Sequence, residues 1–507
     1  MALPNPHVQS SGTEAPAESP RAPAGIPLEA KESRRWLKPR VHSGQLARLA
    51  PKRPKPRRLG HTDIWRRMRT LLWTWWLWFV AALALLYFGH HIAPAILAVV
   101  AIVLYHVVPE SHPAVYAIET HLDPRSDEFR LTVAGATGMP LVEGNAVRLY
   151  QNGEAFFPAM MEAIEQAQHS ITMEQYIFWD GVVGRRFAEA FAERARAGVP
   201  VKLMVDAIGS STIGETVLHT LEQGGCQLAW YRPIHWYTLD RANRRTHRKS
   251  LIVDGSVAFT GGAGLADQWL NPSPLGQPPW RDTQIRVEGP AALAQQAGFA
   301  QNWLQTTGEM ITGSAYFPEL APRGAVEVQT ILSTPVSGAS AAATMVLLAL
   351  QSARRTLFIA NPYFIPDGRM IAMLGDACGR GARVQLMLSG SPCDSWWARQ
   401  NSVRLYGQML HAGVEIYEYQ AAMLHQKTMV VDSAWATVGT ANFDHRSFSF
   451  NDETNVCFHD AALVAELEAS FKRDLAFCHR IELGEWRRRG PWQWAGEMAA
   501  SLLEDQV

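Results

Sequence analysis

The stretch HRKSLIVD occupies His247–Asp254, and the stretch HQKTMVVD occupies His425–Asp432, 178 residues further along a chain of 507 residues. Both stretches keep His, Lys and Asp at the same spacing and place apolar residues directly before the Asp. On a β-strand, residues two positions apart point to the same face, whereas an odd spacing turns two side chains to opposite faces. Each stretch therefore predicts a strand that presents an imidazole and an ammonium together and ends at an aspartate.

The segments around the two stretches also repeat in the same order. Matched positions are offset by 178 to 188 residues along the chain. The matched segments are 161–180 with 347–367, 187–206 with 370–388, and 221–231 with 410–419. Together with the two stretches themselves, these matches indicate an internal duplication. We place the first repeat at 145–324 and the second at 325–485.

Each repeat alternates predicted helices with predicted strands. In the first repeat, the amphipathic stretch Phe187–Ala197 predicts a helix, and the aliphatic run Val201–Val205 predicts a strand after a Gly turn. This alternation is typical of an α/β layer structure with a largely parallel sheet. The sequence Asp-Gly-Ser at 254–256 predicts a tight turn into a further strand. We expect an α/β fold whose two duplicated repeats pack with pseudo-twofold symmetry.

The N-terminal part of the chain has a different composition from the repeats. Two runs without a charged residue, at 71–88 and 92–108, each have about the 17–25 residues that a membrane-spanning helix needs. The Gly-His-His break at 89–91 favours a transmembrane hairpin over one long span, and a buried hairpin in a soluble protein is the alternative. Outside the repeats we expect a disordered tail rich in Pro and basic residues at 1–60, a membrane segment at 66–108, a connector at 109–144 and a C-terminal tail at 486–507.

The charge of the chain is unevenly distributed, although its formal total is zero. Residues 31–70 contain 14 Lys and Arg against two acidic residues, a charge near +12, so the remainder is near −12. A basic block beside apolar runs predicts contact with a membrane bilayer rather than with nucleic acid. With two spans, the positive-inside rule places the repeats on the cytoplasmic side, and with one span it places them outside.

The cysteines and possible metal ligands suggest no cofactor. The five cysteines include no CxxC pair, and no group of residues has the spacing of a metal site. We expect free thiols in a reducing compartment and a site without metal or other cofactor. Any charge in a reaction must then be stabilised by protein side chains.

The two His-Lys faces suggest phosphoryl chemistry when pseudo-twofold packing brings them together. One imidazole, His247 or His425, can attack phosphorus while the other protonates the leaving oxygen. Lys249 and Lys427 can hold the non-bridging oxygens and the charge that grows on them. Because of their spacing, the residues alone favour a structural turn role for the two aspartates of the stretches.

Further residues near the two stretches are candidates to support the site. Glu453 is expected to hold the imidazole of His425, and Asp282 is expected to hold that of His247, which would fix the tautomer of each ring. Arg245 is interpreted as an exposed residue or as a contact for a lipid headgroup, and Arg248 likewise. The other candidates for supporting the site or binding phosphate are Gly262, Gly439, Thr440 and Asn442.

These residues resemble the phospholipase D superfamily, whose pattern His-x-Lys-x4-Asp-x6-Gly-[Gly/Ser/Thr]-x-Asn is present here twice. The apolar N-terminal pair and the segment NPYFIPD at 361–367 resemble the bacterial cardiolipin synthases of that superfamily. The resemblance implies a covalent phosphohistidine on His247, with His425 as general acid and base. It also counts Asp254 and Asp432 in the catalytic motif. The first copy departs from the pattern, because Gly264 stands where Asn is expected.

The resemblance implies a membrane-bound phosphatidyltransferase of a bacterial-type inner membrane. Such an enzyme makes cardiolipin from two molecules of phosphatidylglycerol and releases glycerol. The alternatives are a phosphodiester hydrolase that uses water as acceptor and an inactive membrane scaffold. A nuclease would need a basic groove, whereas the part of the chain outside the basic block is acidic on balance. The acceptor alcohol, the second lipid donor and the oligomeric state stay open.

Overall fold

The computed structural model describes residues 75–88, 92–107, 122–234, 243–273, 276–334, 340–502 and 504. The predicted N-terminal tail at 1–60 lies outside these residues, as does most of the predicted connector before Leu122. The end of that connector forms helix α5 (Asp127–Thr137), which begins at the side chain of Ser126 as its N-cap.

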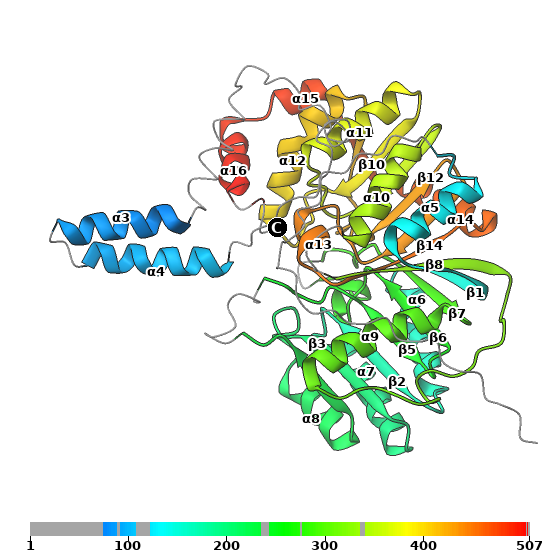
Figure 1. Ribbon diagram of the computed structural model, residues 1–507. Coiled ribbons are helices and arrows are strands. Elements are labelled where there is room, and N and C mark those ends of the chain that lie inside the picture. The colour runs from blue at the N-terminus through cyan, green and yellow to red at the C-terminus, as the bar shows by residue number, and fades with distance from the viewer. Residues whose placement is uncertain are drawn as a thin grey trace, which may run out of the picture. The chain divides into compact units, whose positions relative to one another are not determined.

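Two apolar helices, α3 (Trp75–Tyr87) and α4 (Ile92–Val107), pack side by side as a hairpin (Figure 1). Ala82 and Ala101 are buried in this hairpin, whereas large side chains such as Leu83 are half exposed. Within the described residues, no helix has both the length and the apolar character required to cross a membrane. The ends of the predicted spans fall partly outside the described residues, and passage of this hairpin through a membrane stays a prediction.

The first repeat is built from strands and helices that alternate along the chain. Its elements are β1 (Leu141–Gln151), α6 (Gly153–Glu165), β2 (Ile171–Gln175), α7 (Val182–Arg196), β3 (Val201–Asp206), α8 (Glu215–Gly224), β4 (Gln227–Tyr231), β5 (Ser250–Val253), β6 (Val257–Gly261), the short 3-10 helix η2 (Asp267–Trp269), β7 (Thr283–Glu288) and α9 (Ala292–Thr307). The predicted helix at 187–197 lies within α7 except for Ala197, which is the C-cap of that helix. The predicted strand at 201–205 lies within β3.

The second repeat has the same order of elements, followed by an extension. Its elements are β8 (Val326–Ser333), α10 (Ala341–Ser352), β9 (Thr356–Ala360), α11 (Gly368–Gly379), β10 (Arg383–Ser389), α12 (Trp396–His411), β11 (Glu415–Tyr419), β12 (Thr428–Val431), β13 (Trp435–Gly439), α13 (His445–Ser449), β14 (Glu453–Phe458), α14 (Ala461–Asp474), η3 (Leu475–Phe477), β15 (Cys478–Ile481), α15 (Leu483–Arg487) and α16 (Pro491–Ser501). The segment expected as a C-terminal tail therefore contains α16, which packs against α12.

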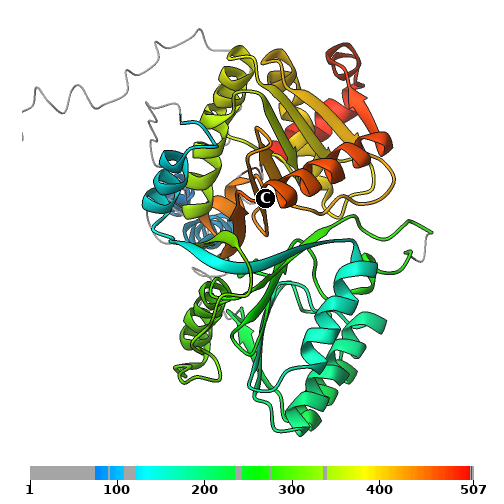
Figure 2. The ribbon, with the colours of Figure 1, turned by 90° about the vertical axis from the view of Figure 1, so that its right-hand side faces the viewer.

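All the described strands form one mixed sheet in the order β15-β11-β10-β9-β12-β13-β14-β8-β1-β7-β6-β5-β2-β3-β4. Apart from the extra edge strand β15, this order reads the same outward in both directions from the antiparallel pair β8–β1. Figures 1 and 2 show the two repeats meeting along these strands. The palindromic order is the arrangement that a pseudo-twofold packing of duplicated repeats produces.

The sheet is less parallel than the alternation of helices and strands predicts. Only β2-β3-β4 and β9-β10-β11 pair in parallel, and the other neighbouring strands pair antiparallel. The reason lies in the two repeated stretches. Each supplies a strand, β5 or β12, that returns through a tight turn into the next strand, so a hairpin replaces a crossover helix at this point.

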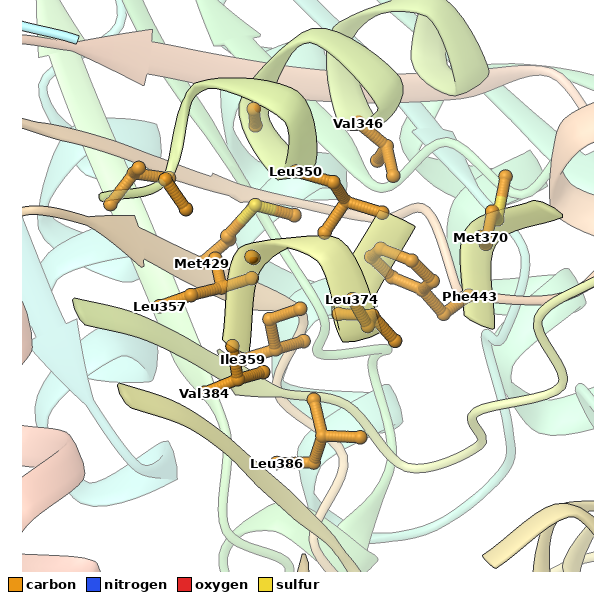
Figure 3. Packing of buried hydrophobic residues seen from close by; sticks show 14 of the residues in the cluster. Val346, Leu350, Leu357, Ile359, Met370, Leu374, Val384, Leu386, Met429 and Phe443 are labelled. Atoms are coloured by element: carbon orange, nitrogen blue, oxygen red, sulfur yellow. The ribbon is translucent and has the colours of Figure 1, made fainter. Parts of the chain in front are cut away.

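Helices cover both faces of the sheet in each repeat. Figure 2 shows α6 and α7 on one face of the first repeat and α9 on the other. In the second repeat, Val346 and Leu350 of α10 and Leu374 of α11 face Ile359 and Leu386 of the sheet (Figure 3). These buried apolar contacts hold the helices on the sheet, which fixes the ends of the strands from which the site is built.

Candidate active site

The two repeated stretches enter the sheet next to the opposite repeat. The backbone N–H of His247 donates to the carbonyl of Asp452 at 2.9 Å, just before β14 of the second repeat. In the same way, the N–H of His425 donates to the carbonyl of Arg281 at 2.8 Å, just before β7 of the first repeat. Isolated parallel bridges join Thr246 to Asp452 and Arg281 to Leu424. Each histidine is thereby positioned beside the strand that carries the acidic residue of the other repeat.

Each carboxylate therefore pairs with the histidine of the other repeat, whereas we expected it to pair with the histidine of its own repeat. His247 Nδ1 lies 3.0 and 3.1 Å from the two carboxylate oxygens of Glu453. His425 Nδ1 lies 2.9 Å from Oδ2 of Asp282. The predictions that Glu453 holds His425 and that Asp282 holds His247 were wrong. They assumed that each repeat completes its own imidazole, whereas the backbone bridges bring β14 to His247 and β7 to His425.

Both carboxylates are fully buried and held by further hydrogen bonds. Glu453 accepts a hydrogen bond from the hydroxyl of Thr440, and Asp282 accepts one from Trp269 Nε1 at 2.8 Å. Burial raises the pKa of each acid, but the neighbouring histidine and lysines outweigh it and leave the pKa of Glu453 and of Asp282 below its ordinary value. An ionised acid accepts the Nδ1–H of its histidine, which leaves Nε2 of that ring free to react.

The two imidazoles are neutral in this environment. Burial lowers the pKa of His247 to about 4, with Glu453 opposing the shift and Lys249 adding to it. Burial and Lys427 lower the pKa of His425 to about 3, against the opposing effect of Asp282. Near neutral pH, both rings therefore carry a lone pair on one nitrogen, which a nucleophile and a general base require.

The two lysines form a buried pair of cations. Lys249 Nζ donates to the carbonyl of His247 at 3.0 Å, and Lys427 Nζ donates to the carbonyl of His425 and lies 3.1 Å from its Nδ1. Burial and repulsion from Lys427 lower the pKa of Lys249 to about 7. Burial lowers the pKa of Lys427 to about 8, although the nearby acids raise it. Two cations that disfavour each other create a site for an anion such as a phosphodiester.

The predicted glycines are required by close packing around the histidines. A Cβ atom at Gly262 would lie 2.2 Å from Oδ1 of Asp282 and 2.6 Å from the carbonyl oxygen of His425. A Cβ atom at Gly439 would lie 2.4 Å from the carboxamide carbon of Asn455. Both contacts are shorter than real Cβ contacts, so each glycine lets the hairpin approach the acid or the neighbouring strand.

The departure from the motif at Gly264 has a steric basis. A Cβ atom at Gly264 would lie 2.6 Å from Cβ of Ile177, so a side chain such as Asn has no room in this backbone arrangement. At the matching position, Asn442 lines a small cavity together with Lys427. Its Oδ1 atom is buried and has no hydrogen-bond partner among the described residues. The two half-sites therefore differ in the polar groups that they can offer to a ligand.

Aromatic rings border both histidines, and of these the match between the repeats marks only Tyr176, either as a residue that lines the site or as a core residue. Trp269 and Trp280 contact the ring of His425, with centroids 5.4 and 5.5 Å away. Tyr176 meets the ring of His247 edge-on at 5.2 Å. Tyrosine can be a core residue as easily as a site residue, and the tryptophans lie outside the repeated stretches. The sequence offered no signal for the two tryptophans except that Trp280 is two residues from Asp282.

The arginines next to His247 are buried, not exposed. Arg245 is 1% exposed and forms a bidentate ion pair with Asp206, with Nη2 to Oδ1 at 2.9 Å. Arg248, also 1% exposed, donates to a backbone carbonyl of α9 and lies 3.9 Å from Glu174. The interpretation of Arg245 and Arg248 as exposed residues or lipid contacts was wrong. Carboxylates on β2 and β3, distant in sequence, make their burial possible.

The two aspartates that end the stretches bind backbone rather than substrate. Asp254 accepts hydrogen bonds from the N–H groups of Gln168, His169 and Ser170 at 2.6–3.1 Å. Asp432 does the same for the N–H groups of 354–356 at 2.7–3.2 Å. Both aspartates have φ of +52° and lie beyond the ends of β5 and β12 that are remote from the histidines. These contacts support the structural turn role that the spacing predicts, in which the aspartates fasten the hairpin turn to the start of β2 or β9. Their place in the catalytic set stays a prediction of the resemblance.

Known proteins resemble this chain in sequence and in fold. The family model described as "Cardiolipin synthase, PLD-like domain" matches residues 160–272 and 346–475. The chain is 31% identical to cardiolipin synthase 1 of Bacillus anthracis over 397 residues, covering 76% of this chain and 77% of that protein. It is also 31% identical to the major cardiolipin synthase of Bacillus subtilis, covering 71% of this chain and 75% of that protein. The fold resembles the crystal structure of phosphatidylserine synthase from Haemophilus influenzae, with a TM-score of 0.57 at 13% identity over 75% of this chain and all of that one.

Proposed function

Because this chain belongs to the phospholipase D superfamily and is a cardiolipin synthase-like enzyme of it, we propose that it is a phosphatidyltransferase that makes cardiolipin. The substrates are two molecules of phosphatidylglycerol, and the second product is glycerol. The observation that carries the proposal is the pair of crossed His–carboxylate contacts beside two buried lysines. The names of the relatives support the choice of lipid.

The reaction proceeds in two displacements at phosphorus. In the first, Nε2 of His247 attacks the phosphorus of one phosphatidylglycerol, and the bond to the headgroup glycerol breaks. His425 delivers a proton to the departing glycerol oxygen. In the second, a headgroup hydroxyl of another phosphatidylglycerol loses its proton to His425 and attacks the phosphohistidine. Cardiolipin leaves and His247 is restored, so the protons balance over the cycle.

The charged side chains of the site can stabilise the charges that form during these steps. Lys249 and Lys427 hold the non-bridging oxygens, where negative charge grows in each transition state. The bound phosphodiester is an anion, and it raises the pKa of His425 from its low value so that the ring can act as an acid. Glu453 fixes the nucleophilic ring, and Asp282 fixes the acid–base ring. The unpartnered carbonyl of Asn442 is suited to accept a hydrogen bond from a hydroxyl of the headgroup.

The substrate class places the enzyme at a membrane. We propose that α3 and α4, with the flanking residues outside the described part, anchor the chain in a bacterial inner membrane. The basic block at 31–70 then lies on the cytoplasmic side together with the catalytic repeats. The apolar surface of the two helices and the bacterial origin of the relatives support this location.

The test uses the purified, detergent-solubilised protein and phosphatidylglycerol as the sole lipid, with products identified by mass spectrometry. We expect cardiolipin and free glycerol in equal amounts, and neither product from His247→Ala. Phosphatidic acid without cardiolipin would mean that water is the acceptor and would replace the synthase by a hydrolase. Absence of any product from the folded wild-type protein would refute the proposed substrate.

A further inference from the structure

Four tryptophans are exposed at the beginnings of two neighbouring helices. Trp396 and Trp397 begin α12 and are 48% and 44% exposed, and Trp492 and Trp494 in the first turn of α16 are 89% and 52% exposed. We call these four residues the tryptophan patch. Tryptophan is normally largely buried, and exposed aromatic groups gathered at one place indicate an interaction surface.

The patch is held together by the packing of α16 on α12. Gln493 Nε2 donates to Gln400 Oε1 at 2.7 Å, and Asn401 Nδ2 donates to the carbonyl of Ala500 at 2.8 Å. These bonds join the two helices along the faces between the tryptophans. The tryptophans therefore sit on a fixed support rather than on a loose tail.

The two tryptophans of α12 contact each other, and one of them rests on α16. The rings of Trp396 and Trp397 meet edge-to-face with centroids 4.9 Å apart. A Cβ atom at Gly496 would lie 3.1 Å from the indole of Trp396, so that ring rests on α16. Trp492 precedes Gly496 by four residues and hence lies on the same side of the helix. Trp494 flanks the other side of the same turn.

The patch adjoins the wall of the second half-site. Ala398, in the first turn of α12, is buried against Tyr363 and Met423, and Trp280 packs on the same cluster. Trp280 in turn contacts the ring of His425. The residue Asp394, just before α12, lies near enough to Lys427 to raise the pKa of its ammonium. The start of α12 therefore lies beside the aromatic wall of His425.

The charge next to the patch is positive. From Arg480 to Glu497 the chain has four arginines and three glutamates, and the ion pair of Arg489 with the buried Glu497 at 2.8 Å removes one charge of each sign. Arg487 and Arg488 are exposed at the end of α15, directly before the helix that carries Trp492. Tryptophans flanked by arginines are typical of surfaces that lie in the headgroup region of an anionic bilayer. Charge complementarity thus favours a bilayer over a second copy of this chain.

We propose that the tryptophan patch docks the catalytic repeats on the surface of an anionic phospholipid bilayer and directs lipid headgroups to the His425 side of the site. This inference rests on the proposed function for the identity of the lipid. It adds the contact surface and the side of entry. The indoles enter the headgroup layer, while Arg487 and Arg488 meet lipid phosphates. Docking in this orientation brings the start of α12 to the lipid from which the headgroup is drawn.

The experiment compares turnover of a bilayer lipid with turnover of a dispersed lipid. The full-length protein is reconstituted in vesicles of phosphatidylglycerol, and separately assayed in detergent with dihexanoyl-phosphatidylglycerol below its micelle concentration. Trp492→Glu and Trp397→Glu place a charge in the patch without emptying a buried site. Leu131→Glu is the matched control, because Leu131 is 64% exposed on α5.

We expect each patch variant to lower turnover in vesicles about tenfold, the effect of roughly one lost favourable contact, while turnover of the dispersed lipid stays within twofold of wild type. Leu131→Glu should change neither. Equal losses on both lipids, or no loss in vesicles, would overturn the docking proposal. A concentration-dependent dimer that the patch variants abolish would also overturn it in favour of a second copy.

Hydrogen exchange separates failure of docking from failure of the proposed function. In wild-type protein, amides at 490–497 should exchange more slowly in phosphatidylglycerol vesicles than in detergent, and Arg487→Ser combined with Arg488→Ser should reverse part of this protection. Protection with no cardiolipin formed would keep the docking surface and refute the synthase. Cardiolipin formation without protection of these amides would keep the synthase and refute the docking surface.

Discussion

The two half-sites share one backbone plan but surround their histidines with different chemistry. Next to His247 lie buried ion pairs, in which Asp206 holds Arg245 and Glu174 lies near Arg248. His425 is bordered instead by Trp269 and Trp280. A buried ion pair between Arg281 and Asp474, at 2.9 Å, also lies next to His425, so the two half-sites differ in the tryptophans rather than in the presence of charged pairs.

This difference teaches how a symmetric scaffold can serve an asymmetric reaction. In the proposed reaction His247 becomes covalently attached and must stay in register while its substituent changes, and ion pairs on both sides of it restrain the backbone that carries it. His425, as the proposed acid–base residue, has to exchange protons and admit an acceptor, and two tryptophans pack against its ring. Substitutions of the imidazoles, the carboxylates, the lysines and the turn aspartates should change turnover by successively smaller factors.

Removal of either imidazole should have the largest effect, with different consequences in the two half-sites. We expect His247→Ala and His425→Ala each to lower turnover by about 10⁴-fold or more, because the members of such a unit act together. Intact-protein mass spectrometry after acid-free quenching should detect a phosphatidyl adduct in His425→Ala and none in His247→Ala. An adduct on the protein that lacks His247 would reverse the two roles.

Loss of charge on the crossed carboxylates should come next. Glu453→Gln and Asp282→Asn should each lower kcat about 10³-fold with little change in KM, because the ring loses the acceptor that fixes its tautomer. Single-turnover kinetics distinguish the two. Glu453→Gln should slow mainly the formation of the adduct on His247, whereas Asp282→Asn should slow both its formation and its resolution by the acceptor, because His425 acts in both steps. The reverse pattern would mean that each acid serves the histidine of its own repeat.

The pH dependence should report both half-sites. His247, with its pKa lowered to about 4, loses its nucleophilic lone pair as the pH falls through that value, so kcat/KM should fall on the acid side. Lys249 and Lys427, with pKa values of about 7 and 8, lose their charge as the pH rises, so kcat/KM should fall on the alkaline side, about tenfold per pH unit between these two values and up to about a hundredfold per pH unit above both.

A lysine substitution tests the assignment of the alkaline limb. Lys249→Arg keeps its charge at high pH, and measured profiles of kcat/KM from pH 4 to 10 should show the alkaline limb moved upward in this variant. An unchanged limb would assign the alkaline loss to another group.

Substitution of the turn aspartates should change turnover least. Asp432 is 2% exposed and Asp254 is half-buried, so we expect Asp432→Asn to lower the free energy of unfolding by about 2 kcal/mol and Asp254→Asn by about 1 kcal/mol. Chemical denaturation measures both. Turnover of the folded variants should stay within about threefold of wild type. A loss comparable to that of His247→Ala would restore these aspartates to the reacting set.

The sequence was sufficient for the features that the duplication encodes locally. The spacing within the repeated stretches predicted a strand in each, although β5 and β12 begin only after Lys249 and Lys427. The order of matched segments predicted repeats whose strand order is a palindrome. The partnership of Glu453 with His247 was out of reach, because it depends on which strand of the other repeat lies beside the stretch. Burial of Arg245 was likewise out of reach, because it depends on the ion pair with Asp206. No periodic pattern in the sequence predicts that Asp206, at the end of β3, lies next to Arg245.

The parallel character of the sheet was overestimated for a related reason. Alternating helices and strands normally imply crossovers, but each strand that begins at a His-Lys pair leads into a hairpin. The aromatic wall was missed because Trp269 and Trp280 have no counterpart in the second repeat by which the duplication would have marked them.

The exchange of carboxylates makes a chain with one repeat chemically incomplete. Such a chain has an imidazole whose acid lies elsewhere and an acid whose imidazole lies elsewhere, and two copies related by a twofold axis would complete both pairs at once. The tandem chain is equivalent to that homodimer with its subunits fused. Identical subunits must change together at every position, whereas fusion lets each half diverge alone. Gly264 facing Ile177 in one half, and Asn442 beside Lys427 in the other, are the kind of difference that a homodimer cannot hold.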